Sequence, residues 1–131
     1  MTISSVAEQV GMTSKAIRYY EQIGLIKPER ESNGYRIYEE RQLSELRLIQ
    51  RCRHLGFSLD ECRDLLALYH NKQRHSRDVK KLAVEKIRDI DHRVAQLLSI
   101  KSSLSLLADQ CQGNDNAACP ILQALVQKRD V

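Results

Sequence analysis

The 131-residue sequence predicts a mainly α-helical fold, with a winged helix-turn-helix in its first half and one long helix in its second. Two stretches with helical spacing of apolar residues meet at Gly11, which predicts a helix-turn-helix. An Asn33-Gly34 turn follows them and predicts a hairpin wing. From about Ser76, apolar residues recur in alternating steps of three and four, which predicts a long coiled-coil helix.

Composition excludes several classes of protein. The longest apolar runs span a few residues, and the N-terminus, MTISSVAEQVG, lacks the basic and apolar regions of a secretory signal. We therefore expect a cytoplasmic protein without a membrane partner, in which the four cysteines stay reduced and serve packing, metal binding or redox chemistry. Lys and Arg balance Asp and Glu at 10 against 10 over residues 1–69, so only the placement of charge can indicate DNA binding there.

The first two helices form the predicted helix-turn-helix. Ser5 and Glu8 make the S-x-x-E pattern of a capping box, which predicts the start of a helix over residues 3–10. Thr13 then caps a second helix, TSKAIRYYEQ, which ends before Gly24.

The second helix has two different faces. Ile17 and Tyr20 stand three residues apart and are expected to face the core, which leaves Lys15, Arg18 and Tyr19 on the opposite side. Cationic and aromatic side chains just past a glycine turn are suited to a DNA groove and its phosphates. An ordinary solvated helix face is the alternative, and this helix alone does not decide between the two.

The wing is expected to pair residues 25–26 with residues 35–38 across the turn at Asn33-Gly34. Tyr35 and Arg36 then lie beside its tip. We expect Arg36 to meet a phosphate, and Tyr35 to pack its ring on a sugar.

Two more helices are expected over residues 41–55 and from Ser58 through Tyr69. Their apolar positions at helical spacing are Leu43, Leu46, Ile49, Cys52 and Leu55 in the first and Leu59, Cys62, Leu65 and Leu66 in the second. We interpret Cys52 and Cys62 as small buried hydrophobic residues rather than ligands.

After the polar, basic residues 70–77, the long helix carries a stripe made of Ala83, Ile87, Ile90, Val94, Leu97, Leu104 and Ala108. One helix in a chain of this size cannot bury such a stripe alone, so we expect it to pair with a second copy as a coiled-coil homodimer. The same step reaches Cys111, where a loop-forming stretch, QGNDN, ends the helix.

Cys111 and Cys119 bracket that loop, with no His, Glu or further Cys between them. Pro120 begins a last short helix, whose N-terminus lowers the pKa of a thiol at Cys119. Two thiolates suit a soft ion of low coordination number such as Cu(I), Ag(I) or Au(I), whereas zinc takes four protein ligands, or three and water. From spacing alone, a redox disulfide and an accidental pair remain open.

Several segments resemble the MerR family of bacterial transcription regulators. These are TSKAIRYYEQIGLI, NGYRIY and LRLIQRCRHLGFSLDE, in that order, and the resemblance covers nearly the whole chain. Within the family, RHSRDVK and CQGNDNAACPI resemble the copper-efflux and gold-sensing branch. The resemblance implies a winged helix-turn-helix DNA-binding domain (1–69), a linker (70–77), a long antiparallel coiled-coil dimerisation helix (78–110), and a C-terminal metal-binding loop with a short helix (111–131).

The resemblance also implies functional residues. Cys111 and Cys119 bind one monovalent ion per chain, and the DNA contacts fall on Lys15, Arg18, Tyr19, Tyr35, Arg36 and, more weakly, Arg53. Promoter DNA with a two-fold operator is bound in both states, and the metal-bound form distorts it so that RNA polymerase can start transcription. No catalytic set of residues is expected.

Selectivity rests on residues outside the cysteine pair. Relatives that sense divalent ions have a cysteine where this chain has Ser76, which weakens a divalent interpretation. Lys80, or its neighbour Lys81, is a candidate counter-charge for an anionic two-thiolate site in the dimer. The loop itself departs from both the copper and the gold pattern, so the choice among Cu(I), Ag(I) and Au(I) stays open. The other hypotheses are a thiol redox regulator that uses a Cys111–Cys119 disulfide, a divalent-metal sensor and a metal-buffering protein.

Overall fold

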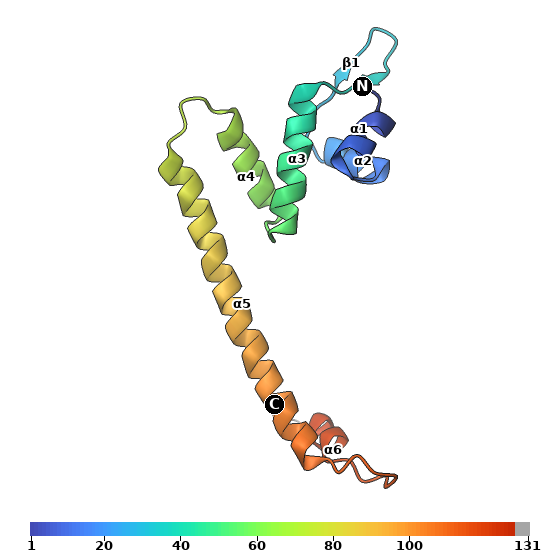
Figure 1. The fold of residues 1–131 in the computed structure, drawn as a ribbon, viewed down its shortest axis with the longest axis vertical. Coiled ribbons are helices and arrows are strands. Elements are labelled where there is room, and N and C mark those ends of the chain that lie inside the picture. The colour runs from blue at the N-terminus through green and yellow to red at the C-terminus, as the bar shows by residue number, and fades with distance from the viewer. Residues whose placement is uncertain (128–131) are drawn as a thin grey trace. The chain divides into compact units, whose positions relative to one another are not determined.

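The structure is a computed structural model that describes residues 1–127, apart from the side chain of Arg36. It is mainly helical, as predicted, and it divides into two compact units, Met1–Leu82 and a second that begins at Ala83 (Figure 1). The described elements are α1 (Ile3–Val10), α2 (Ser14–Gln22), β1 (Glu29–Arg30), β2 (Arg36–Ile37), α3 (Glu40–His54), α4 (Leu59–His70), α5 (Ser76–Gln110) and α6 (Pro120–Val126). Over this part of the chain, no helix has the length and apolar character that a membrane span requires.

The helix-turn-helix is formed by α1 and α2, and local hydrogen bonds define its ends. Thr2 caps α1 by accepting a hydrogen bond at Oγ1 from the N–H of Ser5, at 3.2 Å. The predicted capping box at Ser5 is therefore wrong, because α1 begins directly after Thr2 and Ser5 lies within its first turn. Gly11 ends α1 at φ 70°, and Thr13 caps α2 through the N–H of Ala16 at 3.0 Å.

One apolar core holds the first unit together. Its buried members are Val6, Ala7, Val10, Ile17, Leu25, Ile26, Tyr38, Leu43, Leu46, Ile49 and Leu66, which come from α1 to α4 and the segments around the hairpin. The predicted inward face of α2 is confirmed, since Ile17 is fully buried and Tyr20 packs against this core. The core thus fixes which side of α2 remains in solvent.

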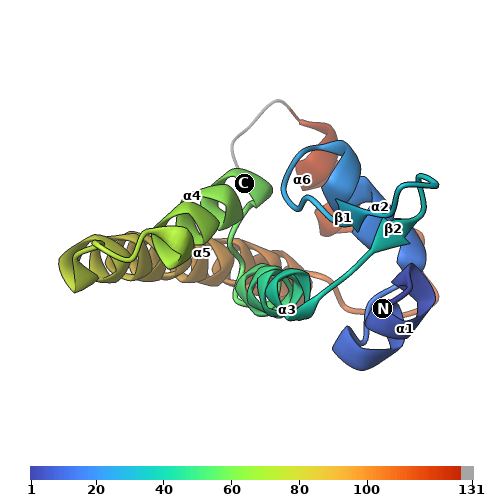
Figure 2. The ribbon, with the colours of Figure 1, turned by 90° about the horizontal axis from the view of Figure 1, so that it is seen from above.

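The hairpin is shorter than predicted. Glu29 pairs with Ile37 and Arg30 with Arg36 in an antiparallel ladder (Figure 2). The expected strand at residues 25–26 is wrong, because both of these side chains are buried in the core directly after α2. Burial of two large aliphatic groups on consecutive residues leaves no alternation for a half-exposed strand.

The helices α3 and α4 are joined by a tight turn with its own apolar cluster. Cys52 and Cys62 are buried there with Phe57, as expected for small hydrophobic residues. The predicted inward position of Leu55 is wrong, since this residue is the C-cap of α3 and its side chain is 61% exposed. Ser58 then begins α4 with the predicted capping box.

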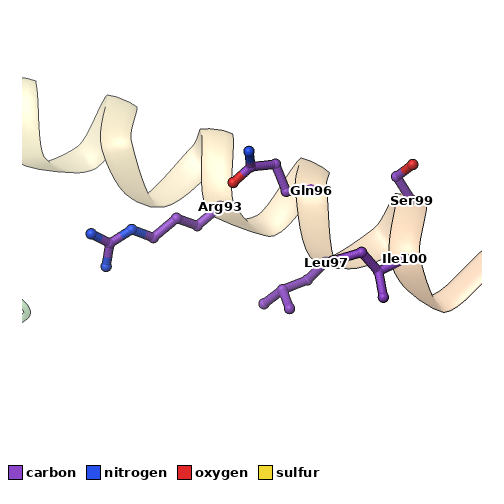
Figure 3. Close-up of a pocket in the computed structure, with 5 residues that line it drawn as sticks. All are labelled: Arg93, Gln96, Leu97, Ser99 and Ile100. Carbon is purple, nitrogen blue, oxygen red and sulfur yellow. The ribbon is translucent and has the colours of Figure 1, made fainter. Parts of the chain in front are cut away.

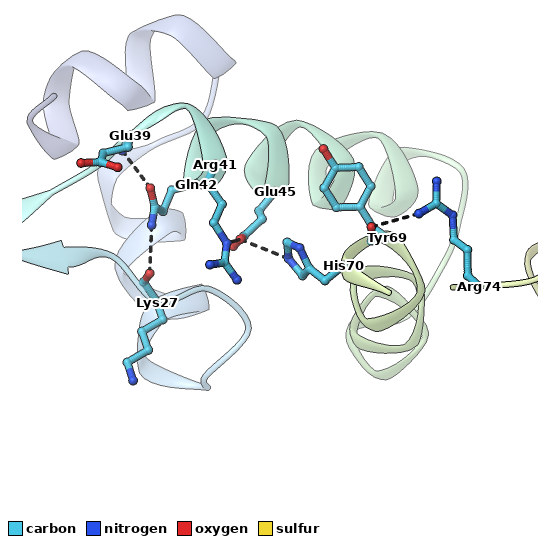
Figure 4. Close-up of polar contacts among 8 residues, drawn as sticks. All are labelled: Lys27, Glu39, Arg41, Gln42, Glu45, Tyr69, His70 and Arg74. Atoms are coloured by element: carbon cyan, nitrogen blue, oxygen red, sulfur yellow. Dashed lines mark hydrogen bonds and ion pairs between the residues drawn. The ribbon is translucent and has the colours of Figure 1, made fainter. Parts of the chain in front are cut away.

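A polar network ties the start of α3 to the end of α4 (Figure 4). The Glu45 side chain is only 7% exposed, and its Oε1 lies 3.1 Å from Arg41 Nε and 3.2 Å from His70 Nε2. Gln42, also buried, donates from Nε2 to the carbonyl oxygen of Lys27 at 3.3 Å. These contacts hold the chain after α2 against α3.

The second unit contains most of α5, together with α6. Apolar side chains of the predicted stripe lie in solvent along α5, with Leu97 exposed at 64%. Leu97 and Ile100 point to the same side of the helix, beside a shallow surface hollow (Figure 3). An apolar stripe left uncovered along a 35-residue helix fits a coiled coil.

We expect Leu46→Ala to lower the free energy of unfolding by about 2–5 kcal/mol, because Leu46 is fully buried in the main core. Urea denaturation at one fixed protein concentration measures the change. Leu55→Ala is the matched control and should change stability by less than about 0.5 kcal/mol, since Leu55 is exposed. Equal effects of the two substitutions would contradict the described core.

Candidate nucleic-acid interface and metal centre

The predicted recognition face of α2 is exposed. Lys15, Arg18 and Tyr19 lie in solvent, with Tyr19 exposed at 48%, while Ile17 anchors the opposite side. The Tyr19 ring is tilted against that of Tyr20, with 6.1 Å between centroids. The face therefore presents two cationic side chains and one aromatic ring that packs against Tyr20, and these groups are suited to contacts with phosphates and base edges.

The wing tip is shaped by Asn33 and Gly34. Asn33 Oδ1 accepts a hydrogen bond from the N–H of Tyr35 at 3.1 Å, and Gly34 takes φ 86°, which favours glycine. Tyr35 is 72% exposed. Arg36 lies in β2, but its side chain is outside the described part of the structure, so its predicted phosphate contact stays a prediction.

An ion pair that the sequence analysis did not predict links the wing to α2. Arg30 Nη2 lies 2.8 Å from Glu21 Oε1, and Arg30 Nη1 donates to the Gly34 carbonyl at 3.1 Å. The Tyr38 hydroxyl donates to Glu21 Oε2 at 3.4 Å. One guanidinium thus joins the wing tip to the C-terminal part of α2, and the two expected DNA-contacting elements are held together.

Arg53 has a structural partner. Its Nη1 donates to the Phe57 carbonyl at 3.0 Å and so closes the turn between α3 and α4. The side chain is exposed, and a guanidinium has further N–H donors. A phosphate contact by Arg53 stays a prediction.

The loop between the two candidate metal cysteines is ordered by its asparagines. Asn114 Oδ1 accepts from the N–H of Asn116 at 2.9 Å, and Asn116 Oδ1 accepts from the N–H of Ala118 at 3.2 Å. Asn114 Nδ2 also donates to Gln112 Oε1 at 3.0 Å. These successive side-chain-to-backbone bonds bend the chain back on itself. The composition that predicted only a loop therefore supplies the turns that return the chain toward the end of α5.

Cys111 and Cys119 are brought together by this loop. Both are half-buried, and the Cys111 thiol is close enough to Cys119 to affect its ionisation. Cys119 is the N-cap residue of α6, although its side chain makes no regular capping hydrogen bond. The nearby N–H of Leu122, followed by that of Ile121 and the Cys111 thiol, lowers the pKa of Cys119. Cys119 therefore loses its proton more readily than an ordinary thiol does.

Other candidate ligands are sparse. Among residues 1–127, no group of three or more His, Cys, Asp or Glu side chains is arranged to hold a metal ion. Ser76 and Lys80 lie one turn apart at the start of α5, exposed, and line one surface hollow with Val79. Their predicted roles toward the metal site stay predictions.

The remaining cysteines have the opposite chemistry. Burial raises the pKa of Cys62 to about 11, and the neighbouring Cys52 adds to the increase. Burial also raises the pKa of Cys52. Both thiols therefore stay protonated at neutral pH and make weak nucleophiles and poor metal ligands.

We expect iodoacetamide to alkylate Cys119 before Cys52 or Cys62 in the reduced, metal-free protein at about pH 7, because only the thiolate reacts. Time-resolved peptide mass spectrometry measures the order. Denaturant should equalise the rates, since it removes both the burial and the α6 N–H groups. Labelling of Cys62 as fast as Cys119 in the folded protein would contradict the described environments.

Comparison with known proteins agrees with this fold and surface. The family described as "MerR HTH family regulatory protein" matches residues 1–68, and that described as "MerR, DNA binding" matches residues 43–107. The chain is 49% identical over 125 residues to the HTH-type transcriptional regulator HmrR of Rhizobium leguminosarum bv. viciae, over 95% of this chain and 97% of the relative. It is 46% identical over 126 residues to the HTH-type transcriptional regulator CueR of Salmonella typhimurium LT2, over 95% and 91% of the two chains.

The fold matches a solved structure over nearly its whole length. The transcription regulator PbrR691 from Ralstonia metallidurans CH34, crystallised in complex with lead(II), superimposes with a TM-score of 0.85 at 29% identity, over 95% of this chain and 98% of that chain. These relatives are transcription regulators rather than enzymes. The predicted family is therefore confirmed: the chain belongs to the MerR family of DNA-binding, helix-turn-helix transcription regulators, which has metal-binding members.

Proposed function

We propose that this regulator activates transcription in response to a monovalent coinage-metal ion, Cu(I), Ag(I) or Au(I), bound once per chain by Cys111 and Cys119. The observation that carries the proposal is a pair of adjacent thiols with no third candidate ligand around them in the described chain. Genes for metal efflux or detoxification are the targets that this chemistry suggests. The regulator then acts on promoter DNA in the bacterial cytoplasm.

The donor set fits such an ion. Two sulfur ligands suit a soft, monovalent ion of low coordination number, which gains little from oxygen or nitrogen donors. The N–H groups at the start of α6 stabilise negative charge on Cys119, and Lys80 is the proposed counter-charge from the dimer. When bound, the ion supplies a link between the end of α5 and the start of α6.

The dimer follows from the exposed stripe on α5. Val94, Leu97 and Leu104 lie in solvent within one chain, and a second copy is the simplest cover for a stripe of this length. An antiparallel pairing of two such helices gives a homodimer with two-fold symmetry. That symmetry predicts an operator with two matching half-sites.

DNA binding is assigned to the exposed face of α2 and to the wing. Lys15, Arg18 and Tyr19 provide groove and phosphate contacts, and Tyr35 and Arg36 provide contacts beside the wing tip. We propose that occupation of the metal site changes the angle between the two DNA-binding units, so that the promoter is distorted and RNA polymerase starts transcription. A coupling of about 1–3 kcal/mol between the two sites is sufficient for such a switch.

A divalent ion is the second candidate, since PbrR691 was crystallised in complex with lead(II). In this chain a divalent ion needs at least one further ligand beyond the two thiols. Ser76 offers a hydroxyl rather than a thiolate at the position where divalent sensors have a cysteine. Any added donor must then come from elsewhere in the dimer.

An anaerobic titration tests the proposal. We expect the reduced protein to take one Cu(I) per chain in competition with a strong Cu(I) chelator, and to bind Zn(II) far more weakly. Cys111→Ser should remove the tight Cu(I) binding, while Cys52→Ala should leave it unchanged. Zn(II) binding as tight as Cu(I) binding would replace the monovalent assignment by a divalent one. Failure to bind either ion would favour the redox hypothesis.

A further inference from the structure

Side chains from α3 and α4 hold the backbone on both sides of α2, at the turn before it and at the turn after it. Arg63 Nη2 donates to the carbonyl oxygen of Ile23 at 3.1 Å, and Nη1 donates to that of Gly24 at 3.4 Å. In the turn between α1 and α2, Gln50 Nε2 donates to the carbonyl oxygen of Gly11, the C-cap of α1, at 3.3 Å. These contacts join residues about forty positions apart in the chain.

The Arg63 side chain donates its hydrogen bonds at the C-terminal end of α2, where backbone carbonyl groups lack partners within the helix. The last carbonyl groups of a helix have no partners within the helix and form the negative end of its dipole. Gly24 turns the chain away from α2 at φ 76°, which leaves the carbonyls of Ile23 and Gly24 open to a donor. A guanidinium brings a positive charge and two N–H groups in one plane, and its hydrogen bonds are charge-assisted.

Arg63 is not needed to fill the core. Its side chain is exposed, whereas the neighbouring Cys62 and Leu66 are buried and supply the packing of α4. Among the described residues, the side chain has no acidic partner within ion-pair distance. Its polar contacts in the structure are those with the end of α2.

We propose that Arg63 is a positioning residue for the recognition helix, with Gln50 as its counterpart at the turn that precedes this helix, and that it contributes to sequence specificity without touching a base. The proposal rests on the proposed role of α2 in reading DNA. Hydrogen bonds to base edges depend on the angle at which a helix enters the groove, whereas phosphate attraction tolerates small tilts. Loss of the Arg63 hydrogen bonds should therefore weaken binding to a specific DNA site more than binding to DNA of random sequence.

The experiment compares two DNA duplexes, one with a two-fold site selected by the wild-type protein from a random pool and one of scrambled sequence. Fluorescence anisotropy with the full-length protein measures both affinities over a range of salt concentrations. For Arg63→Ala we expect about a tenfold loss on the selected site, the size of one charge-assisted hydrogen bond, with no change on the scrambled duplex. Arg63→Lys should restore part of the loss, because an ammonium group can still donate to one carbonyl.

Two controls separate this proposal from the others. Arg88→Ala removes one positive charge on α5 and should change neither affinity. Arg63→Ala should leave the salt dependence of binding unaltered, since no phosphate contact is lost. Losses on both duplexes with a smaller salt slope would make Arg63 a phosphate contact and overturn the proposal.

The remaining outcomes are also decisive. If Arg18→Ala abolishes specific binding but neither Arg63 variant has any effect, then the positioning role alone fails. If Arg18→Ala has no effect either, then the assignment of α2 as the recognition helix fails as well. Should Arg63→Ala not fold by circular dichroism, Arg63→Lys and Gln50→Ala carry the same comparison, and full wild-type specificity in both would overturn the proposal.

Discussion

Cys111→Ser and Cys119→Ser will each abolish metal-dependent activation of transcription while leaving operator affinity within about twofold of the wild-type value. The thiols lie at the end of α5 and the start of α6, and α2 and the wing lie in the other compact unit. A serine hydroxyl has nearly the shape of a thiol but does not ionise at neutral pH, so it cannot serve as a soft ligand. Transcription in vitro from a promoter that the wild-type protein activates, with and without Cu(I), measures the first effect.

The same samples allow the binding measurement and its control. Anisotropy with metal-free protein should give equal operator affinities for wild type and both serine variants. Cys52→Ala is the matched control, because it removes a thiol that is buried between α3 and α4 and should keep full activation. Loss of DNA binding in either serine variant would contradict the separation of sensing from DNA binding.

The redox hypothesis makes a different prediction for these proteins. A Cys111–Cys119 disulfide requires the two sulfurs to meet, and in the structure Cys111 is close enough to Cys119 to lower the pKa of its thiol. If the disulfide were the signal, then a thiol oxidant such as diamide would activate transcription without metal. If transcription does not change with diamide but increases with Cu(I), then metal binding is the signal and the redox hypothesis is wrong.

Local patterns predicted the elements but not all of their ends. Three predicted boundaries are found in the structure: the end of α1 at Gly11, the hairpin turn at Asn33-Gly34 and the start of α6 at Pro120. They could be predicted because the backbone preferences of these residues act within a few positions of the chain. The capping residue of α1 is Thr2 rather than the predicted Ser5, because both are good capping residues and only the observed helix start decides between them. The hairpin was extended into residues 25–26 because burial in the core and pairing in a strand both favour aliphatic side chains.

The candidate site divides in the same way. The cysteine pair and the exposed face of α2 could be predicted from residue spacing, since the residues of each set lie within ten positions of one another in the sequence. The bonds from Arg63 to Ile23 and from Arg30 to Glu21 could not, because nothing near an arginine in sequence indicates which distant oxygen it will meet. The asparagine turns of the metal loop were visible only as a loop-forming composition.

Arg18→Ala will weaken binding to the selected two-fold site by at least about tenfold, since a base or phosphate contact of an arginine is worth roughly 1–3 kcal/mol and each dimer loses two. Arg18 is exposed beside Tyr19 on the side of α2 opposite Ile17, so its removal should leave the fold intact. Anisotropy measures the affinity, and circular dichroism checks the fold. A loss of salt dependence together with affinity would identify a phosphate as its partner.

The same variant tests the hypothesis that the chain merely buffers metal. Cu(I) affinity of Arg18→Ala should equal that of wild type, because Cys111 and Cys119 are unaltered, while activation of transcription should be lost with DNA binding. Arg88→Ala again controls for the removal of one positive charge and should behave as wild type in every assay. A metal buffer without a role in DNA binding would show no difference between the two variants. Wild-type DNA affinity in Arg18→Ala would move the recognition surface away from this face of α2, and the wing residue Tyr35, 72% exposed, would then be the next position to substitute.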